Sequence, residues 1–217
     1  MIVRTAAKEA DTVGYESRTL RLADEQLAQA GEALARAFFD DPMILYLFPD
    51  EAQRSKLLPS FMQVGVRLCQ PFEDVHTTAG EVHGAACWLP PGHSELTDEG
   101  MAQAGALDLF ERMGEEATEK FGAMMGQLGE IHAEKMTLPH WYLLLLGVDP
   151  PQQGQGRGSD LVAPILRRAD TEGLPCYLET MTERNVSFYR KHGFEVVVED
   201  DIAGDGPHFW TMRRDPR

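Results

Sequence analysis

The sequence predicts an α/β (α+β) domain whose mixed, mostly antiparallel central sheet is flanked by helices. Three observations favour this fold class. Short apolar runs with strand character recur along the chain, a tight turn at 79–81 joins two of them, and the apolar run 141–148 precedes an amphipathic helix and another strand. With 217 residues, 43% of them hydrophobic, the chain can bury a full core as a single domain over residues 1–217.

Residues 17–22 are predicted as a first strand. Asp24 then provides an N-cap for a helix whose apolar spacing continues until Pro42. A second helix is expected over residues 51–69. Pro59 lies inside it and predicts a kink or a break, because proline lacks the N–H group that a helix interior requires.

The middle of the chain combines a hairpin with a long helix-forming segment. Residues 75–78 and 82–89 are predicted as two strands that turn at Ala79-Gly80-Glu81. Residues 98–135 are rich in Met, Ala and Glu, and their glycines should divide them into two or more helices. The C-terminal part is expected to alternate strands and helices, in the order strand 141–148, helix 157–172, strand 176–181, helix 185–191 and strands near 194–199 and 207–213.

The glycine-rich turn after residues 141–148 is the most informative stretch of the chain. Gly154, Gly156 and Gly158 let backbone N–H groups turn toward a ligand, and the positive end of the following helix favours negative charge. The turn therefore predicts a pyrophosphate site. A P-loop is disfavoured because no Gly-Lys-Ser/Thr follows, and the glycine spacing also differs from Gly-x-Gly-x-x-Gly.

This turn resembles the acetyl-CoA signature of the GNAT acetyltransferase superfamily, Gln/Arg-x-x-Gly-x-Gly/Ala, through Gln153, Gly156 and Gly158. Residues 185–194, Asn-Val-Ser-Phe-Tyr-Arg-Lys-His-Gly-Phe, resemble the Asn, Tyr and Gly-Phe region of the same superfamily. Two such motifs in the right order are more specific than either alone. Within the superfamily, the pieces Leu-Glu-Thr, Arg-Asn and Phe-Tyr are most similar to puromycin N-acetyltransferases and their relatives.

The resemblance implies a GNAT-type fold, in which the fourth and fifth strands are parallel and splay apart, with acetyl-CoA in the gap. The segment 98–135 would then be a helical insertion into the minimal core. The residues implied in cofactor binding lie at the strand end, in the turn and on the last helix, and they are Leu146, Gly147, Val148, Gln153, Gly154, Gln155, Gly156, Arg157, Gly158, Ser159, Asn185, Phe188 and Tyr189.

Transfer of an acetyl group from a thioester to an amine needs an acid for the departing thiolate and a base for the substrate ammonium. The resemblance implies that Tyr189 is the acid, and the Val148 N–H group is expected to polarise the acetyl carbonyl. Asn185 is expected to cap its helix and to bond the pantetheine. Glu179 is the preferred base from its strand position, and the weaker candidates are Glu111, Glu115, His83 and His140.

Structural roles compete with each of these assignments. Glu179 could instead form a salt bridge or bond to Asn185, and each histidine is more often structural than catalytic. Other side chains that could line a substrate pocket, but are more often core residues, are Met101, Met113, Met124, Met125, Trp88, Trp141, Trp210 and Tyr46.

The composition limits the kinds of molecule that the protein is expected to bind. The net charge of −15 argues against nonspecific binding to nucleic acid or to an anionic membrane, and it is compatible with a cationic substrate. Cys69, Cys87 and Cys176 are scattered, which indicates reduced, mostly buried thiols rather than disulfides or a zinc site. The absence of a long apolar run or a signal-peptide pattern favours a cytoplasmic location.

The leading hypothesis from the sequence is therefore an acetyl-CoA-dependent N-acetyltransferase that acts on a small amine, such as an antibiotic, a polyamine-like compound or another metabolite. Three alternatives stay open at this point. The nearest is the same fold with a different acyl donor or an oxygen nucleophile. The others are a non-catalytic acyl-CoA-binding or sensing protein and an enzyme that acetylates a basic peptide or protein. The oligomeric state is also open, with a homodimer as one alternative.

Overall fold

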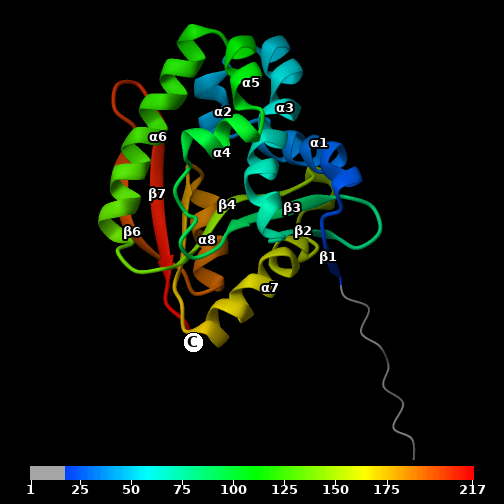
Figure 1. Ribbon diagram of the computed structural model, residues 1–217, viewed down its shortest axis with the longest axis vertical. Coiled ribbons are helices and arrows are strands. Elements are labelled where there is room, and N and C mark those ends of the chain that lie inside the picture. The colour runs from blue at the N-terminus through cyan, green and yellow to red at the C-terminus, as the bar shows by residue number, and fades with distance from the viewer. Residues whose placement is uncertain (1–17) are drawn as a thin grey trace, which may run out of the picture.

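The computed structural model describes residues 18–217, which form a seven-stranded sheet with helices on both faces (Figure 1). The strands are β1 (Thr19–Arg21), β2 (Val75–Thr78), β3 (Gly84–Leu89), β4 (Trp141–Val148), β5 (Cys176–Thr180), β6 (Glu195–Asp201) and β7 (His208–Arg214). The helices are α1 (Leu27–Phe38), α2 (Pro42–Leu47), α3 (Glu51–Cys69), α4 (Asp98–Gln103), α5 (Ala106–Met113), α6 (Glu115–Lys135), α7 (Arg157–Glu172) and α8 (Glu183–Lys191), with 3₁₀ turns η1 (Asp24–Gln26), η2 (Gln70–Phe72) and η3 (Pro150–Gln152). The expected start of the first strand, Ser17, lies outside the described residues.

The sheet is antiparallel except for one pair of neighbouring strands. Its order is β1-β2-β3-β4-β5-β7-β6, and β4 runs parallel to β5. These two strands pair only at Trp141 with Cys176 and at Tyr142 with Tyr177, so they separate beyond Tyr142. The predicted mixed sheet, with splayed and parallel fourth and fifth strands, is confirmed.

A β-bulge in β4 lies close to the point where the strands separate. Along the β3–β4 ladder, Cys87 pairs with Leu145 and Trp88 pairs with Leu143, which leaves Leu144 as an extra residue on β4. A bulge bends its strand and increases the local twist. The bulge therefore gives a physical reason why β4 turns away from β5 after only two paired positions.

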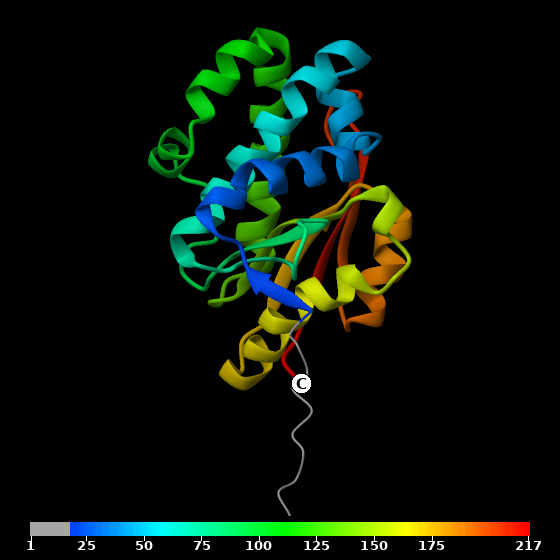
Figure 2. The ribbon, with the colours of Figure 1, turned by 90° about the vertical axis from the view of Figure 1, so that its right-hand side faces the viewer.

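Two hydrophobic layers cover the faces of the sheet (Figures 1 and 2). Helices α1, α3, α5 and α6 pack on one face, where Leu34, Leu58 and Met124 are fully buried. Helices α7 and α8 pack on the other face, where Leu161 and Val186 are buried. The gap between β4 and β5 opens between these two layers.

The N-terminal helices differ in detail from the predictions. Asp24 lies inside η1 rather than at the N-cap of α1, and its carboxylate accepts a hydrogen bond from Gln70 Nε2 at 2.5 Å. That expectation was wrong because a 3₁₀ turn precedes the helix. The short helix α2 was not predicted. Asp41 caps it by accepting from the N–H group of Met43 at 3.0 Å, and Pro42 occupies its first position.

Helix α3 continues without interruption through Pro59, so the alternative of a break was wrong. The helix buries Leu57, Leu58 and Met62 around the proline. Burial of three such side chains outweighs the roughly 3 kcal/mol that an interior proline costs a helix. In contrast, the predicted division of residues 98–135 is confirmed, because α4, α5 and α6 are separated at Gly105 and Gly114, whose φ angles are +85° and +84°.

The C-terminal elements follow the predicted order, and several of their boundaries are shifted by one or two residues. Helix α8 begins at Glu183 and its N-cap position is Thr182, so the expectation that Asn185 caps this helix was wrong. The three cysteines are buried and unpaired, as predicted. Among residues 18–217, no helix is long and apolar enough to span a membrane.

Candidate active site

The glycine-rich turn connects β4 to α7. Gly154 and Gly156 have φ angles of +75° and +82°, in the left-handed region that other residues rarely adopt. A Cβ atom at either position would meet no other atom within 4 Å. The requirement for glycine at these two positions is therefore conformational, and the space around them is open.

Backbone donors in this turn are unused. Within residues 18–217, the N–H groups of residues 154–159 donate to no acceptor, whereas Gln153 donates to the carbonyl oxygen of Pro150 and Asp160 to that of Gly156. The first turn of a helix leaves such donors free and carries the positive end of the helix dipole. The turn adds further donors to those of the helix, and the residues present therefore fit a bound pyrophosphate.

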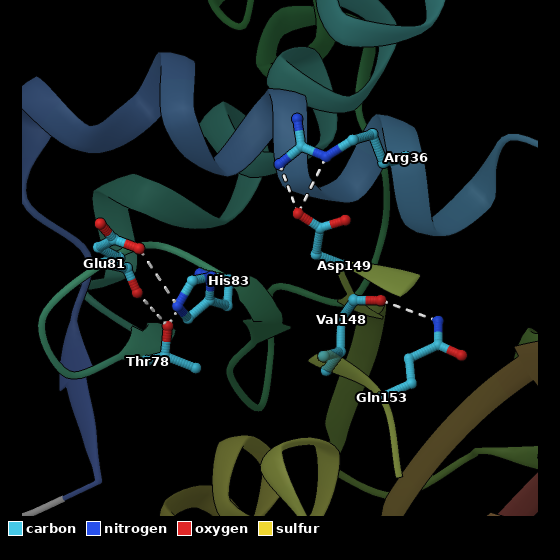
Figure 3. Close-up of polar contacts among 7 residues, drawn as sticks. All are labelled: Arg36, Thr78, Glu81, His83, Val148, Asp149 and Gln153. Carbon is cyan, nitrogen blue, oxygen red and sulfur yellow. Dashed lines mark hydrogen bonds and ion pairs between the residues drawn. The ribbon is translucent and has the colours of Figure 1, made fainter. Parts of the chain in front are cut away.

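Two side-chain contacts and one backbone hydrogen bond connect the turn to neighbouring segments (Figure 3). Gln153 Nε2 donates to the carbonyl oxygen of Val148 on β4 at 2.9 Å. Arg36 of α1 donates from Nε and Nη2 to the Asp149 carboxylate, at 3.0 and 2.7 Å. The N–H group of Asp149 donates to the carbonyl oxygen of His83, which precedes β3. The backbone of the turn is thus held by contacts that leave its free N–H groups unobstructed.

The open edge of β4 presents the N–H group of Val148. Gly84 and Val148 face each other across the β3–β4 ladder, and the adjacent hydrogen bond runs from Asp149 to His83. This pattern identifies Gly84 and Val148 as a non-hydrogen-bonded pair, so the N–H group of Val148 points away from β3. Because β5 pairs with β4 only near Trp141, that N–H group faces the gap between the strands.

A cavity of about 140 Å³ lies where β4 and β5 separate. Its polar lining includes Asp41, Glu179, Thr180, Asn185 and Tyr189, so the preferred base and the preferred acid of the sequence analysis share one cavity. Most of the remaining lining is apolar. It comes from β4, α3, the loop before α4 and the helices of residues 98–135, and includes Phe61, Met62, Leu68, Leu96, Met101, Leu109, Phe110, Phe121, Met125, Leu128 and Leu146.

Glu179 extends from β5 into a nearly closed environment, with its side chain 11% exposed. Burial raises its pKa to about 7, while the nearby hydroxyl groups of Tyr142 and Tyr177 act in the opposite direction. Among residues 18–217, the Tyr177 hydroxyl has no well-aligned hydrogen-bond partner. His132 Nδ1 of α6 lies 3.8 Å from Glu179 Oε1. A carboxyl group with a pKa near neutrality can accept a proton at physiological pH.

Tyr189 lies on α8 and is 7% exposed. Its ring packs edge-on against Phe188 and Phe194, with centroid distances of 5.2 and 5.7 Å. Burial raises the pKa of its hydroxyl, and the negative charge of Asp41 acts in the same direction. The phenol therefore keeps its proton throughout the neutral range, as a general acid must.

Asn185 and Asp41 connect the cavity wall to the start of α8. The side-chain amide of Asn185 donates to Thr180 Oγ1 at 3.1 Å, so it does not bond Glu179. Asp41 Oδ2 accepts from Thr182 Oγ1 at 3.2 Å, and burial raises the pKa of Asp41. These contacts fix the segment between β5 and α8, which carries the wall of the cavity.

A sequence model described as an acetyltransferase (GNAT) domain matches residues 115–196, from α6 through the glycine turn to the start of β6. An uncharacterized N-acetyltransferase of Schizosaccharomyces pombe is 29% identical over 180 residues, which are 80% of this chain and 72% of that protein. Residues 115–196 are therefore similar to GNAT acetyltransferase domains, and most of the chain is similar to a protein named as an N-acetyltransferase.

The chain is also similar to a second acetyltransferase. Mycothiol acetyltransferase of Propionibacterium freudenreichii is 31% identical over 63% of this chain and 45% of that protein. Neither of these two relatives is a puromycin N-acetyltransferase, and they do not support the finer resemblance drawn from the sequence. The similarity to a GNAT acetyltransferase domain and to a protein named as an N-acetyltransferase supports an enzyme rather than a non-catalytic sensing protein.

Solved structures share the GNAT fold over nearly the whole chain. A Corynebacterium glutamicum protein, described as histone acetyltransferase HPA2 and related acetyltransferase, has a TM-score of 0.66 at 20% identity, covering 92% of this chain and 96% of that one. Arylalkylamine N-acetyltransferase 2 of Aedes aegypti has a TM-score of 0.62 at 13% identity, with 92% and 99% covered. A polyamine N-acetyltransferase of Drosophila melanogaster that forms N-acetylagmatine has a TM-score of 0.58 at 14% identity, with 91% and 98% covered.

Several residues that the sequence assigned to the GNAT cofactor site also have packing roles. A Cβ atom at Gly147 would lie 2.8 Å from Leu34 and 3.0 Å from Phe38, so this glycine permits the close approach of α1. A Cβ atom at Gly158 would lie 3.4 Å from the Phe188 ring. Ser159 Oγ lies 2.9 Å from His192 Nε2, which leaves its N–H group as its free donor.

The weaker base candidates lie away from the cavity lining. Glu111 and Glu115 are exposed. His83 belongs to the β2–β3 turn, where its N–H group donates to Thr78 Oγ1 at 2.9 Å and its Nε2 lies 3.6 Å from the Glu81 carboxylate (Figure 3). His140 does not line the cavity, but it contacts His132, which approaches Glu179.

The aromatic and methionine candidates divide between core and cavity. Trp88, Trp141, Met113 and Met124 are buried core residues, whereas Met101 and Met125 line the cavity. Trp210 and Tyr46 do not line it. Sequence reasoning missed the residues around Glu179 and the cavity wall, namely Asp41, Tyr142, Tyr177 and His132. Only Asp41 carried a local signal, since an Asp-Pro pair is a good helix start.

Proposed function

We propose that this N-acetyltransferase transfers an acetyl group from acetyl-CoA to the primary amine of a small molecule with an apolar body. The observation that carries the proposal is the shared cavity, in which Glu179 and Tyr189 line the gap between β4 and β5 together with largely apolar side chains. One proton acceptor and one proton donor in the same cavity are what amine acetylation requires.

Acetyl-CoA would be held by the turn and by the open edge of β4. The free N–H groups of residues 154–159 suit its pyrophosphate, and the exposed edge at Leu146 and Val148 suits the amide groups of its pantetheine arm. When bound, acetyl-CoA supplies the activated acetyl thioester. Gln153 would act indirectly, because its side chain holds the carbonyl oxygen of Val148.

The chain's own groups would carry out the proton transfers. Glu179 would accept a proton from the substrate ammonium, since its pKa of about 7 lets it be ionised and still basic near neutral pH. Tyr189 would donate its phenolic proton to the departing thiolate and would be restored by the proton that the nitrogen loses as the amide forms. The N–H group of Val148 would stabilise negative charge that develops on a carbonyl oxygen in the gap, as oxyanion-type donors do.

The cavity supports a particular class of acceptor. Its two carboxyl groups, those of Asp41 and Glu179, suit one amino group, and its aromatic and methionine side chains suit a hydrophobic body. The compared arylalkylamine N-acetyltransferase is named for an acceptor of this kind, whereas the agmatine-acetylating enzyme takes a second cationic group. We therefore propose an arylalkylamine-like or other apolar amine ahead of a polyamine, and a small molecule ahead of a protein tail.

Calorimetry with acetyl-CoA and CoA tests the cofactor, and a thiol-release assay tests the acceptor. The expected results are micromolar cofactor binding and faster thiol release with phenylalkylamines than with agmatine or spermidine at equal concentration. Failure to bind acetyl-CoA would refute the cofactor assignment. Faster turnover of agmatine or spermidine would refute the preference for an apolar body while leaving the acetyltransferase assignment intact.

A further inference from the structure

His132 and His140 form a direct contact beside the cavity. His132 lies on α6 and His140 immediately precedes β4, and their Nε2 atoms are 2.7 Å apart. The His132 ring stacks on Tyr177, with a centroid distance of 4.2 Å and an interplanar angle of 25°. The second ring nitrogen of His140, Nδ1, lies 2.8 Å from the carbonyl oxygen of Leu138. Both rings are therefore held in place by partners on either side.

The partners of these rings determine where each proton lies. A carbonyl oxygen only accepts hydrogen bonds, so His140 Nδ1 carries a proton that it donates to Leu138. His140 is 4% exposed and burial lowers its pKa, so the ring is neutral and its Nε2 is a bare acceptor. The proton in the short contact must then come from His132 Nε2. Burial also lowers the pKa of His132, to about 4, which leaves its Nδ1 without a proton.

The tautomer of His132 determines whether α6 offers Glu179 an N–H donor or a bare nitrogen. The unprotonated Nδ1 of His132 faces Glu179 Oε1 at 3.8 Å, too far for a hydrogen bond. Two acceptor atoms have no reason to approach more closely. If the proton of His132 were on Nδ1 instead, the ring would offer the carboxylate an N–H donor and stabilise its ionised form.

We propose that His132 and His140 are a positioning pair that holds the His132 tautomer with its Nδ1 lone pair toward Glu179. The carboxylate then receives no N–H donor from α6, and it stays basic enough to accept the substrate's proton. The proposal rests on the proposed role of Glu179 as the general base. His140 acts only through His132, and neither ring needs to touch the substrate.

Other groups near Glu179 and His140 also act on the pKa values of these two residues. Tyr142 of β4 and Tyr177 of β5 face the carboxylate with their hydroxyl groups, and burial raises the pKa of both, so they stay neutral. Arg213 of β7 acts on the pKa of His140 and lowers it, which helps to keep that ring uncharged. Neither tyrosine changes charge near neutral pH, so the His132 tautomer is the variable that a substitution at His140 alters.

The test compares two substitutions of His140. His140→Leu removes the acceptor for His132 Nε2 and frees the His132 proton to move to Nδ1. In His140→Gln the side-chain oxygen replaces the acceptor and the amide replaces the donor to Leu138, so this variant serves as the matched control. The titration of Glu179 is followed by NMR of ¹³C-labelled glutamate carboxyl carbons, with Glu179→Gln used to assign the signal.

We expect His140→Leu to lower the pKa of Glu179 by about one unit or more, which is the size of effect that one N–H donor has on a carboxylate. In His140→Gln, the pKa of Glu179 should stay near its wild-type value. His132→Phe keeps the stacked ring without its nitrogens, and adding His140→Leu to it should cause no further shift. The proposal would be overturned if the pKa of Glu179 were the same in wild type and His140→Leu. It would also be overturned if His140→Leu and His140→Gln shifted that pKa by the same amount.

The acid limb of the kcat/KM profile distinguishes this inference from the assignment of the base. If Glu179 is the base, the limb moves to lower pH in His140→Leu together with the NMR titration. If the NMR value shifts while the limb does not move, the tautomer is confirmed and the role of Glu179 as base fails. Thermal unfolding and acetyl-CoA affinity, measured on every variant, establish that each comparison is made between folded proteins.

Discussion

The side-chain amide of Gln153 donates to the carbonyl oxygen of Val148 at 2.9 Å, so the first residue of the glycine-rich motif holds the end of β4 (Figure 3). A glutamine at this place need not touch the cofactor to matter. It fixes the geometry between the strand edge and the free N–H groups of the turn, and the first prediction concerns this contact.

Gln153→Ala should raise the Kd for acetyl-CoA about fivefold, because one net hydrogen bond is worth about 1 kcal/mol and the turn loses its link to β4. Gln155→Ala is the control, since the exposed Gln155 side chain makes only a 3.4 Å contact to Pro151. Calorimetric titration of both variants measures the effect. Equal losses of affinity would show that the link to Val148 has no special role.

Gly156→Glu should weaken acetyl-CoA binding more than 100-fold, since it places a negative charge where the proposed site holds a pyrophosphate. Gly204→Glu is the matched control. Gly204 has nearly the same φ angle, +83° against +82°, and is equally open, but it lies in the turn between β6 and β7. Both variants should lose a similar amount of stability from backbone strain. The anion-site assignment fails if their affinities for acetyl-CoA agree.

Tyr189→Phe should lower kcat about 10²- to 10⁴-fold and leave the Kd for acetyl-CoA nearly unchanged, because it removes only the proposed acidic proton. Tyr46→Phe controls for the loss of a hydroxyl group outside the cavity lining. Steady-state kinetics and calorimetry measure the two quantities. Wild-type turnover in Tyr189→Phe would exclude this residue as the acid.

Glu179→Gln should remove the rise of kcat/KM with pH that centres near pH 7, the pKa of the Glu179 carboxyl group. The loss of activity should be largest between about pH 7 and 8, where the carboxylate is ionised and a substrate amine with a pKa near 10 is still an ammonium. At higher pH the amine deprotonates without help and the loss should shrink. A pH profile with the wild-type acid limb would point to another base.

The same substitution should increase stability at alkaline pH. The pKa of Glu179 is raised from 4.5 to about 7 by folding, so the folded protein binds more protons than the unfolded chain between these values. The resulting stabilisation is complete below the unfolded pKa and is lost as the pH rises through about 7. At pH 8, the free energy of unfolding of Glu179→Gln should therefore be about 2 to 3 kcal/mol higher than that of wild type. At pH 4, the two free energies of unfolding should be nearly equal. Urea unfolding at both pH values measures the difference, and an equal effect at both would contradict it.

Much of the fold follows from local sequence signals. The bounds of β4 and α7 agree with the predictions, because an apolar strand followed by glycines and an amphipathic helix is specified within a few residues. The predictions failed where neighbouring elements decide. Pro59 remains inside α3 because the helix is buried, and Asn185 lies beyond the N-cap because α8 begins two residues earlier.

The sequence by itself determined the order of the elements, the glycine-rich turn with its free donors, and Tyr189 and Glu179 as candidates. Only the tertiary structure decided which groups surround Glu179. His132, Tyr142 and Asp41 reach the cavity or the carboxylate from separate elements. The physical reason is that strand and turn formation depend on neighbouring residues, whereas the pKa of a buried carboxyl depends on side chains that folding brings together from distant parts of the chain.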